Sequence, residues 1–216
     1  MNEIIDLTYI INEEMITYPT PWHPKVSIGR LGKIEEVGRN TRKITLGTHT
    51  GTHIDAPLHF ISNGKSIDVI PLEKMVGEVT ILDFSNFKEN QPIKKEDLVN
   101  KKISKRMIFR FGWQRFWNKK EFYENYPYFT EDAANYLVTN GVEVVGYDTP
   151  SPDESKKRED GIDSPIHKIF LKNEVVLLEY LANLDKLKNL EGWNLVIAPM
   201  KIEDSDGAPA RVFVFQ

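Results

Sequence analysis

The stretch HTGTHIDAPLHF, residues 49–60, holds three of the chain's five histidines together with one aspartate. Gly51, the β-branched threonines beside it and Pro57 all disfavour an α-helix here. In an extended segment, side chains two residues apart point to the same side. The stretch is therefore predicted to be extended or irregular and to direct four polar side chains to one place. These are His49, His53, Asp55 and His59.

The four side chains allow two interpretations. Imidazole and carboxylate groups together suit a divalent ion such as zinc, manganese or iron. Alternatively, they are scattered polar residues of a loop whose histidines bind backbone groups. We favour a metal site because three histidines occur with an aspartate between them. The stretch lacks the glutamate and the helix of the HExxH zinc-protease motif, so the base must come from elsewhere, and His59 is the nearest candidate.

Composition limits the classes of protein that this chain can represent. Its 216 residues can bury a sizeable core, and its net charge of −4 argues against a nucleic-acid partner. No apolar run approaches the ~18 residues of a membrane-spanning helix, and the N-terminus lacks the basic region of a secretory signal. We therefore expect a soluble, cytoplasmic protein. The absence of cysteine means that nitrogen and oxygen atoms must hold any metal.

Strand patterns outnumber helix patterns, and helices alternate irregularly with the strands. No repeat or linker interrupts the chain, so we predict a single α/β domain over residues 1–216 with a mixed sheet. The expected strands are 3–7, 42–46, 77–84, 106–111, 142–148, 194–199 and 211–215, and 174–181 is a further apolar run. The expected helices are 94–102 and 131–138, with Thr130 as N-cap of the latter.

Three loops carry further expectations. The proline-rich segment 18–24 holds Tyr18 and Trp22, which either form a wall for a flat substrate or cover the edge of the core. We expect His23 at the surface, because nothing else clusters with it. The aromatic segment 113–123 is either a substrate lid or a contact between subunits. The polar segment 151–163 is expected to be a surface loop.

Two more segments contain residue types suited to chemistry. Residues 148–151 directly follow an expected strand, where α/β sheets tend to place functional side chains. Downstream, His167 is the only histidine in the second half of the chain. Glu179 lies inside the apolar run VVLLEYL, where a carboxylate must be exposed, paired or metal-bound, because unpaired burial is costly. The alternative is that Glu179 lies on the solvated face of a helix that begins there.

These segments together resemble the cyclase family, whose best-known members are bacterial kynurenine formamidases. The resemblance rests on HTGTHIDAPLHF, then YDTPSPD (147–153), His167 and Glu179, and finally DGAPARV (206–212). The opening IIDLTYIINEEMITYP, residues 4–19, is also similar to the start of that family. The similarity runs through nearly the whole chain in the same order.

The resemblance implies a site for two divalent metal ions, typically zinc, with manganese as the alternative. In that site, His59 would donate and accept protons while hydroxide generated at the metals attacks a small amide. It also implies a compact α/β domain with a barrel-like mixed sheet and flanking helices, usually assembled as a homodimer or larger oligomer. The implied ligands are His49, His53 and Asp55 for the first ion, with Asp55 bridging to a second ion that His167 and Glu179 also bind.

Candidate partners that would orient these ligands are Thr52, Thr149 and Ser151. The first loop departs from the formamidase pattern, since Tyr18 replaces a tryptophan and Pro19-Thr20-Pro21 replaces a proline-glycine-aspartate turn. The leading expectation is hydrolysis of N-formylkynurenine, and the alternative is a cyclic amide such as isatin or another small amide or ester. A non-catalytic metal site is a third possibility, but structural zinc sites are usually closed and rich in cysteine.

Overall fold

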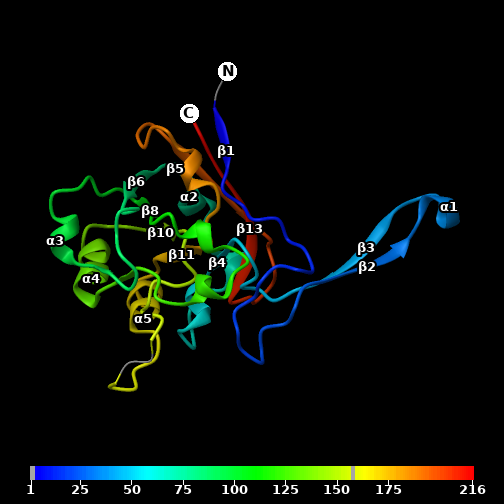
Figure 1. The fold of residues 1–216 in the computed structure, drawn as a ribbon, viewed down its shortest axis with the longest axis horizontal. Coiled ribbons are helices and arrows are strands. Elements are labelled where there is room, and N and C mark those ends of the chain that lie inside the picture. The colour runs from blue at the N-terminus through cyan, green and yellow to red at the C-terminus, as the bar shows by residue number, and fades with distance from the viewer. Residues whose placement is uncertain (1–2, 157–158) are drawn as a thin grey trace.

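Strand β4 (His53–Asp55), from the histidine-rich stretch, lies inside a nine-stranded mixed sheet in the computed structural model, which describes residues 3–156 and 159–216 (Figure 1). Both neighbours of β4 run antiparallel to it. Beyond one of them the sheet continues through three parallel strands. In order, the strands are β5 (Val76–Glu78), β12 (Asn194–Pro199), β13 (Gly207–Phe215), β4, β11 (Val176–Glu179), β10 (Val144–Tyr147), β8 (Arg106–Arg110) and β6 (Thr80–Asp83), with β1 (Ile4–Asp6) paired to β13.

The two ends of this sheet are joined by a single residue. β5 and β6 occupy opposite ends of the strand order, and only Val79 separates them in sequence. The sheet must therefore curl until its ends approach each other, which makes it barrel-like. This confirms the predicted mixed α/β class but corrects the prediction of one strand over 77–84. The chain changes strand at Val79, whose N–H donates a hydrogen bond to the carbonyl of Trp193 at 3.1 Å.

Helices α4 (Glu131–Thr139) and α5 (Pro165–Lys172) pack together on the outside of the sheet. Thr130 precedes α4 as predicted, but its hydroxyl donates to the Ile93 carbonyl at 2.9 Å and does not cap a helix N–H. The helix expected over 94–102 is only the short α3 (Lys95–Leu98). None of the helices in the described ranges is long and apolar enough to cross a membrane. The other short elements are α2 (Leu72–Met75), β7 (Pro92–Ile93), β9 (Tyr128–Phe129) and the 3-10 turns η1 (Pro57–His59), η2 (Ile67–Val69), η3 (Trp113–Phe116), η4 (Lys120–Tyr123) and η5 (Leu184–Lys186).

Alternating side chains divide the core between the two faces of the sheet. On β10, Val144 belongs to the cluster inside the curled sheet, and Val145 belongs to the cluster that includes α4 and α5. On β4, Ile54 points into the inner cluster. His53 and Asp55 must therefore point to the opposite, helix-covered face.

An arm projects from this body (Figure 1). It consists of β2 (Ser27–Gly32) and β3 (Thr41–Thr45), a separate antiparallel pair, with α1 (Ile34–Val37) at its tip. The strand predicted over 42–46 is therefore confirmed, but its partner β2 was not predicted.

The aromatic segment 113–123 contributes to the core. Trp113 and Phe122 are fully buried, and the indole N–H of Trp113 donates to the Phe122 carbonyl at 2.9 Å. Trp117 stacks on Tyr9 with ring centroids 3.8 Å apart. Trp113, Trp117 and Phe122 are thus held within the body, which argues against a substrate lid. The alternative, a contact between subunits, stays a prediction.

Candidate functional site

Strand pairing places Glu179 beside the histidine-rich stretch. In the antiparallel register of β4 and β11, Glu179 lies opposite His53. Its carboxylate is buried, with Oε2 3.5 Å from His53 Nε2 and Oε1 accepting a hydrogen bond from the Tyr147 hydroxyl at 2.7 Å. Glu179 therefore lies in a strand and inside the site, which corrects the alternative of a solvated helix face.

Helix α5 brings His167 to the same place. Its Nε2 lies 3.6 Å from Asp55 Oδ2 and 3.4 Å from Glu179 Oε1. Its other ring nitrogen, Nδ1, lies 2.6 Å from Asp153, whose carboxylate also accepts the backbone N–H groups of Ile166 and His167. Asp153 thus fixes both the first turn of α5 and the orientation of the imidazole.

This role of Asp153 corrects part of the expectation of a surface loop over 151–163: residues 151–153 are buried, whereas residues 156 and 159–163 are exposed as expected. Ser151 and Asp153 are buried, and the Ser151 hydroxyl accepts the backbone N–H of Asp153 at 3.1 Å. Two residues of the expected loop, 157 and 158, lie outside the described ranges. Asp153 was not predicted as a site residue, although it closes the YDTPSPD segment.

Asp206 joins the two remaining histidines. His49 contacts Asp55 Oδ1 through Nδ1 and Asp206 Oδ2 through Nε2, both at 2.8 Å. His59, on η1, places Nδ1 3.2 Å from the same Asp206 oxygen, and the two imidazole rings are 3.9 Å apart. Asp206 was also missed from the sequence, although it opens the DGAPARV segment.

The next residue, Gly207, has no side chain, and this lets the His49 ring and strand β4 lie close to the backbone of β13. A Cβ atom there would lie 2.7 Å from the Ile54 carbonyl oxygen and 2.9 Å from His49 Cε1. His23 supports the same histidine, because its Nε2 lies 2.9 Å from the His49 carbonyl oxygen and the ring is half-buried. The prediction of His23 as an isolated surface residue is therefore wrong.

The donor atoms fit a divalent metal ion. His53 Nδ1 lies 2.7 Å from the Gly51 carbonyl, so it carries the proton and leaves a lone pair on Nε2. That buried Nε2 has no hydrogen-bond partner among the described residues, and it faces the carboxylates of Asp55 and Glu179. Two sets of donor atoms each lie within 4.8 Å of one another: those of His49, Asp55 and His59, and those of His53, Asp55 and Glu179.

The charges also favour cations. Burial lowers the pKa of His49, but Asp55 and Asp206 outweigh burial and raise it to about 10. Burial also lowers the pKa of His167, but Asp153 and Glu179 outweigh burial and raise it to about 10. The carboxylates therefore create a negative field strong enough to hold protons on buried imidazoles, and the same field attracts divalent ions.

A cavity of about 1290 Å³ opens over these residues. Tyr18 and Trp22 line it as expected from the first loop, and Trp22 is 82% exposed. Tyr18 contacts Tyr123 edge to face, with ring centroids 5.6 Å apart. The aromatic segment 113–123 therefore supports the wall that Tyr18 forms.

Three other residues that the sequence singled out lie beside the site but not in it. The Thr52 and Thr149 hydroxyls donate to backbone carbonyls of Tyr180 and Ser151, at 2.7 and 3.2 Å. The carboxylate of Asp148 accepts the backbone N–H groups of Phe111 and Trp113, both at 2.8 Å, and holds that turn in place. Among the described contacts of these three candidates, Ser151 is the one connected to a candidate ligand: its hydroxyl binds the backbone of Asp153, whose carboxylate contacts His167.

Comparison with known proteins agrees with this architecture. The Cyclase family model matches residues 5–154. A kynurenine formamidase of Bacillus cereus (strain ATCC 10987 / NRS 248) is 32% identical over 99% of this chain and 97% of its own length. Isatin hydrolase A of Ralstonia solanacearum shares the fold, with a TM-score of 0.89, 24% identity and coverage of 99% of this chain and 92% of that one. A Bacillus stearothermophilus protein described as a predicted metal-dependent hydrolase has a TM-score of 0.73 and 28% identity, covering 100% and 98% of the two chains. The full-length match and the family model show that this chain belongs to the cyclase family.

Proposed function

We propose that this chain is a metal-dependent hydrolase of a small aromatic amide, with N-formylkynurenine as the first candidate substrate. The observation that carries the proposal is the lone pair of His53 Nε2, which has no hydrogen-bond partner among the described residues and is buried beside Asp55 and Glu179. Leaving such an atom unsatisfied is costly, and a metal ion would satisfy it. The 32% identity to a kynurenine formamidase supports the choice of substrate class.

Two ions per chain are proposed, because Asp55 belongs to both donor sets and presents different oxygens to the candidate ligands on either side. Its Oδ1 faces His49 and His53, and its Oδ2 faces His167. Zinc is the first candidate and manganese the alternative, since both accept nitrogen and oxygen donors. When bound, such ions polarise an amide carbonyl and lower the pKa of water toward ~7. The proposed ligands are His49, His53 and Asp55 for one ion and Asp55, His167 and Glu179 for the other.

His59 is proposed as the residue that moves protons. Its donor atom also falls in the set with His49 and Asp55, so a ligand role is the competing assignment. We favour proton transfer because Nδ1 faces the Asp206 carboxylate, which leaves Nε2 free to hold a proton on the cavity side. From there it can protonate the leaving nitrogen, since an amine anion is a poor leaving group.

The aromatic residues at the cavity mouth are proposed to bind the substrate. Trp22 offers a largely exposed indole, and Tyr18 offers a ring held in place by Tyr123. Burial, together with the charge of Glu179, raises the pKa of Tyr18, so its hydroxyl stays neutral and can donate a hydrogen bond. Both rings suit a flat aromatic amide.

A cyclic amide such as isatin is the second candidate substrate. The departure of the first loop from the formamidase pattern favours this alternative, because that loop forms the cavity mouth. A small-molecule substrate follows from either candidate. The cytoplasmic location and the homodimer remain predictions.

The test compares hydrolysis of N-formylkynurenine and isatin by protein whose metals are counted by elemental analysis. Rapid turnover of N-formylkynurenine with about two metals per chain would support the first candidate. Turnover of isatin alone would support the second. Protein that holds its metals and hydrolyses neither compound would contradict both substrate assignments, and the metal-stripped protein serves as the control for metal dependence.

A further inference from the structure

The segment YDTPSPD, residues 147–153, contributes none of the proposed metal ligands, yet both of its end residues contact one. At one end, the hydroxyl of Tyr147 donates to Glu179 Oε1 at 2.7 Å, since an ionised carboxylate only accepts hydrogen bonds. At the other end, Asp153 Oδ2 lies 2.6 Å from His167 Nδ1. The two contacted residues are the proposed ligands that one ion, called here the second ion, does not share with the other.

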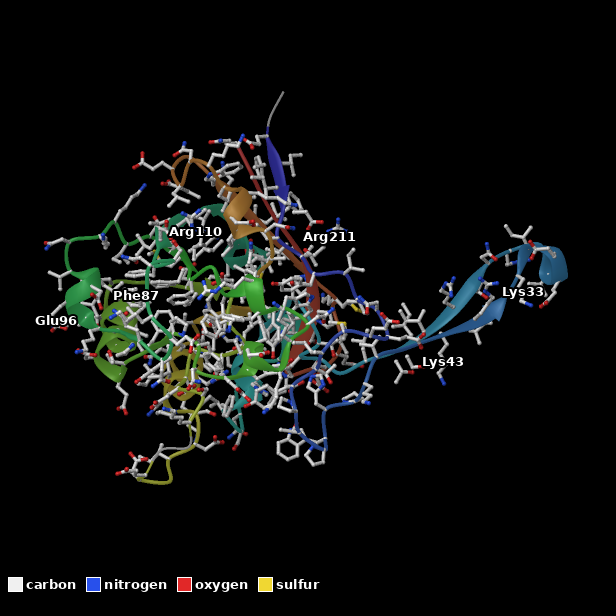
Figure 2. All side chains as sticks on the ribbon, in the orientation of Figure 1. Lys33, Lys43, Phe87, Glu96, Arg110 and Arg211 are labelled. Carbon is white, nitrogen blue, oxygen red and sulfur yellow. The ribbon has the colours of Figure 1, made fainter. Side chains whose placement is uncertain are left out.

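Strand register brings the Tyr147 hydroxyl to Glu179. In the parallel pair of β10 and β11, Gly146 lies opposite Leu178. The next residues on the two strands are Tyr147 and Glu179, so their side chains point to the same face of the sheet. On the other side of β11, Glu179 lies opposite His53. The Tyr147 ring is fully buried in the body of the molecule, where side chains crowd together (Figure 2), so the hydroxyl is held in place.

Each of these hydrogen bonds fixes how a ligand is presented. With Oε1 bound by Tyr147, the Glu179 carboxylate lies 3.4 Å from His167 Nε2. With Nδ1 bound by Asp153, the His167 ring turns Nε2 toward Asp55 Oδ2, 3.6 Å away. Groups that orient metal ligands in this way typically contribute about 10–100-fold to metal affinity.

Backbone hydrogen bonds hold the segment against the chain that follows Glu179. The N–H of Tyr180 donates to the Thr149 carbonyl at 3.3 Å. The N–H of Leu181 donates to the Tyr147 carbonyl at 3.0 Å. The orienting residues and the end of β11 therefore form one connected unit.

The first ion, assigned to the two histidines of the histidine-rich stretch, has different orienting groups. His53 Nδ1 lies 2.7 Å from the Gly51 carbonyl oxygen. His49 Nε2 lies 2.8 Å from Asp206 Oδ2. Neither of these partners belongs to residues 147–153, so the groups that orient the two sets of ligands are separate.

We propose that Tyr147 and Asp153 are positioning residues that set the affinity of the second ion and leave the first ion nearly unaffected. The inference rests on the proposed two-ion site, but it concerns hydrogen bonds of the protein and not the substrate. It gives the segment 147–153 a role that its residues do not have as ligands.

The test withdraws Zn²⁺ from the metal-loaded protein with increasing concentrations of a chromophoric chelator, which reports the affinity of each ion without a substrate. The wild type should release about two ions per chain. Tyr147→Phe removes the hydroxyl and keeps the buried ring, and Asp153→Asn removes the charge that holds the imidazole. Each change should weaken one ion by about 10–100-fold and leave the other near its wild-type affinity.

Combined variants show whether the two residues serve the same ion. Tyr147→Phe with Asp153→Asn should still hold one ion with near wild-type affinity, because both changes act on the second ion. Tyr147→Phe with Asp206→Asn should hold neither ion with wild-type affinity, because Asp206 orients a ligand of the first.

Two controls separate positioning from a loss of stability. Asp148 is a buried carboxylate of the same segment, and it accepts the backbone N–H groups of Phe111 and Trp113. Asp148→Asn should therefore change the free energy of unfolding in urea but keep both zinc affinities. Tyr136→Phe, on α4, removes a tyrosine hydroxyl far along the chain from the segment and should change neither affinity.

Three results would overturn the proposal. Tyr147→Phe and Asp153→Asn could keep both wild-type affinities, their combination could weaken both ions, or Asp148→Asn could weaken one ion as much as Asp153→Asn does. A wild type that holds fewer than two ions would contradict the two-ion site, and this inference with it. Protein that shows the expected affinities but hydrolyses neither candidate amide would contradict the substrate assignment and leave the roles of Tyr147 and Asp153 supported.

Discussion

One oxygen of Asp206, Oδ2, lies 3.2 Å from Nδ1 of His59 and also contacts Nε2 of His49 at 2.8 Å. The same carboxylate thus orients the proposed proton-transfer residue and a proposed metal ligand. Hydrogen bonds from His49 and His59 hold the pKa of Asp206 well below its usual range, so it is ionised whenever the protein is folded at neutral pH.

Asp206→Asn should therefore reduce activity by about 10–100-fold, the range typical of residues that orient metal ligands. Asparagine keeps the shape of aspartate but loses its charge. Its single amide oxygen can accept only some of the hydrogen bonds that the carboxylate accepted. Steady-state kinetics at saturating metal is the measurement. Asp204→Asn is the matched control, because Asp204 is exposed on the same loop. Equal activities of the two variants would contradict the role of Asp206.

His59→Ala should leave the metal content near normal and lower kcat by about 10²–10⁴-fold. The reason is that the imidazole is proposed to carry protons and the ligands proposed for the ions lie elsewhere. Elemental analysis and kcat measured on the same preparation test this. Loss of metal together with activity would make His59 a ligand, as its proximity to His49 and Asp55 allows.

Asp55→Asn should lose both metal and activity. Asp55 is buried, and despite that burial the neighbouring histidines, His49 foremost, hold its pKa well below the usual range. An amide cannot offer two anionic oxygens to two ions. The measurement is the metal content per chain after gel filtration. Asp204→Asn, treated in the same way, is the control. Full occupancy in Asp55→Asn would remove the bridging role.

The sequence predicted correctly that His53 and Asp55 point to one place, because side chains along a strand alternate between its two faces with a period of two residues. His53 and Asp55 share a face on β4, and Glu179 joins them across the β11 register. His49 and His59 lie outside the strand, in a turn and on η1, so the period does not explain their positions. They converge because Asp206 binds both, and a contact across about 150 residues leaves no periodic signal in the sequence.

Other differences have local causes. The strand predicted over 77–84 divides at Val79 because the curled sheet needs β5 and β6 at opposite ends of its strand order. That requirement belongs to the tertiary fold and not to the apolar pattern. Asp153 looked like part of a polar loop because its neighbours are polar, whereas its burial depends on the start of α5 and on His167. Only the position of Asp153 and Asp206 at the edges of the family-like segments could have indicated them.

Gly207→Ala should destabilise the protein by about 1–3 kcal/mol and lower metal occupancy. The added methyl group would meet the Ile54 carbonyl and the His49 ring, so β13 must move away from β4 or His49 must turn. Urea unfolding and elemental analysis measure the two effects. Gly29→Ala is the matched control, because a Cβ atom there meets nothing within 4 Å. It should change stability by less than about 0.5 kcal/mol.

The free energy of unfolding should fall as the pH rises from about 4 to 6, because Asp148 ionises in this range. Burial raises the pKa of this carboxyl to about 6, against the opposing effect of hydrogen bonds from the backbone N–H groups of Phe111 and Trp113. Between the unfolded value near 4 and the folded value near 6, the folded state binds the extra proton, so ionisation at higher pH favours unfolding. The full loss is on the order of 3 kcal/mol above this window.

Asp148→Asn isolates the effect, because the variant keeps every other titrating group and lacks this one. It is expected to be less stable than the wild type at pH 4 to 5. The NH₂ group of asparagine cannot accept a hydrogen bond, so only one oxygen remains for the two backbone N–H donors. The difference in unfolding free energy should then narrow as pH rises through 6, the wild type alone losing stability. Urea unfolding of both proteins across this range is the measurement. A difference that stays constant with pH would mean that Asp148 is already ionised at the acid end, and that its two backbone hydrogen bonds outweigh the cost of burial.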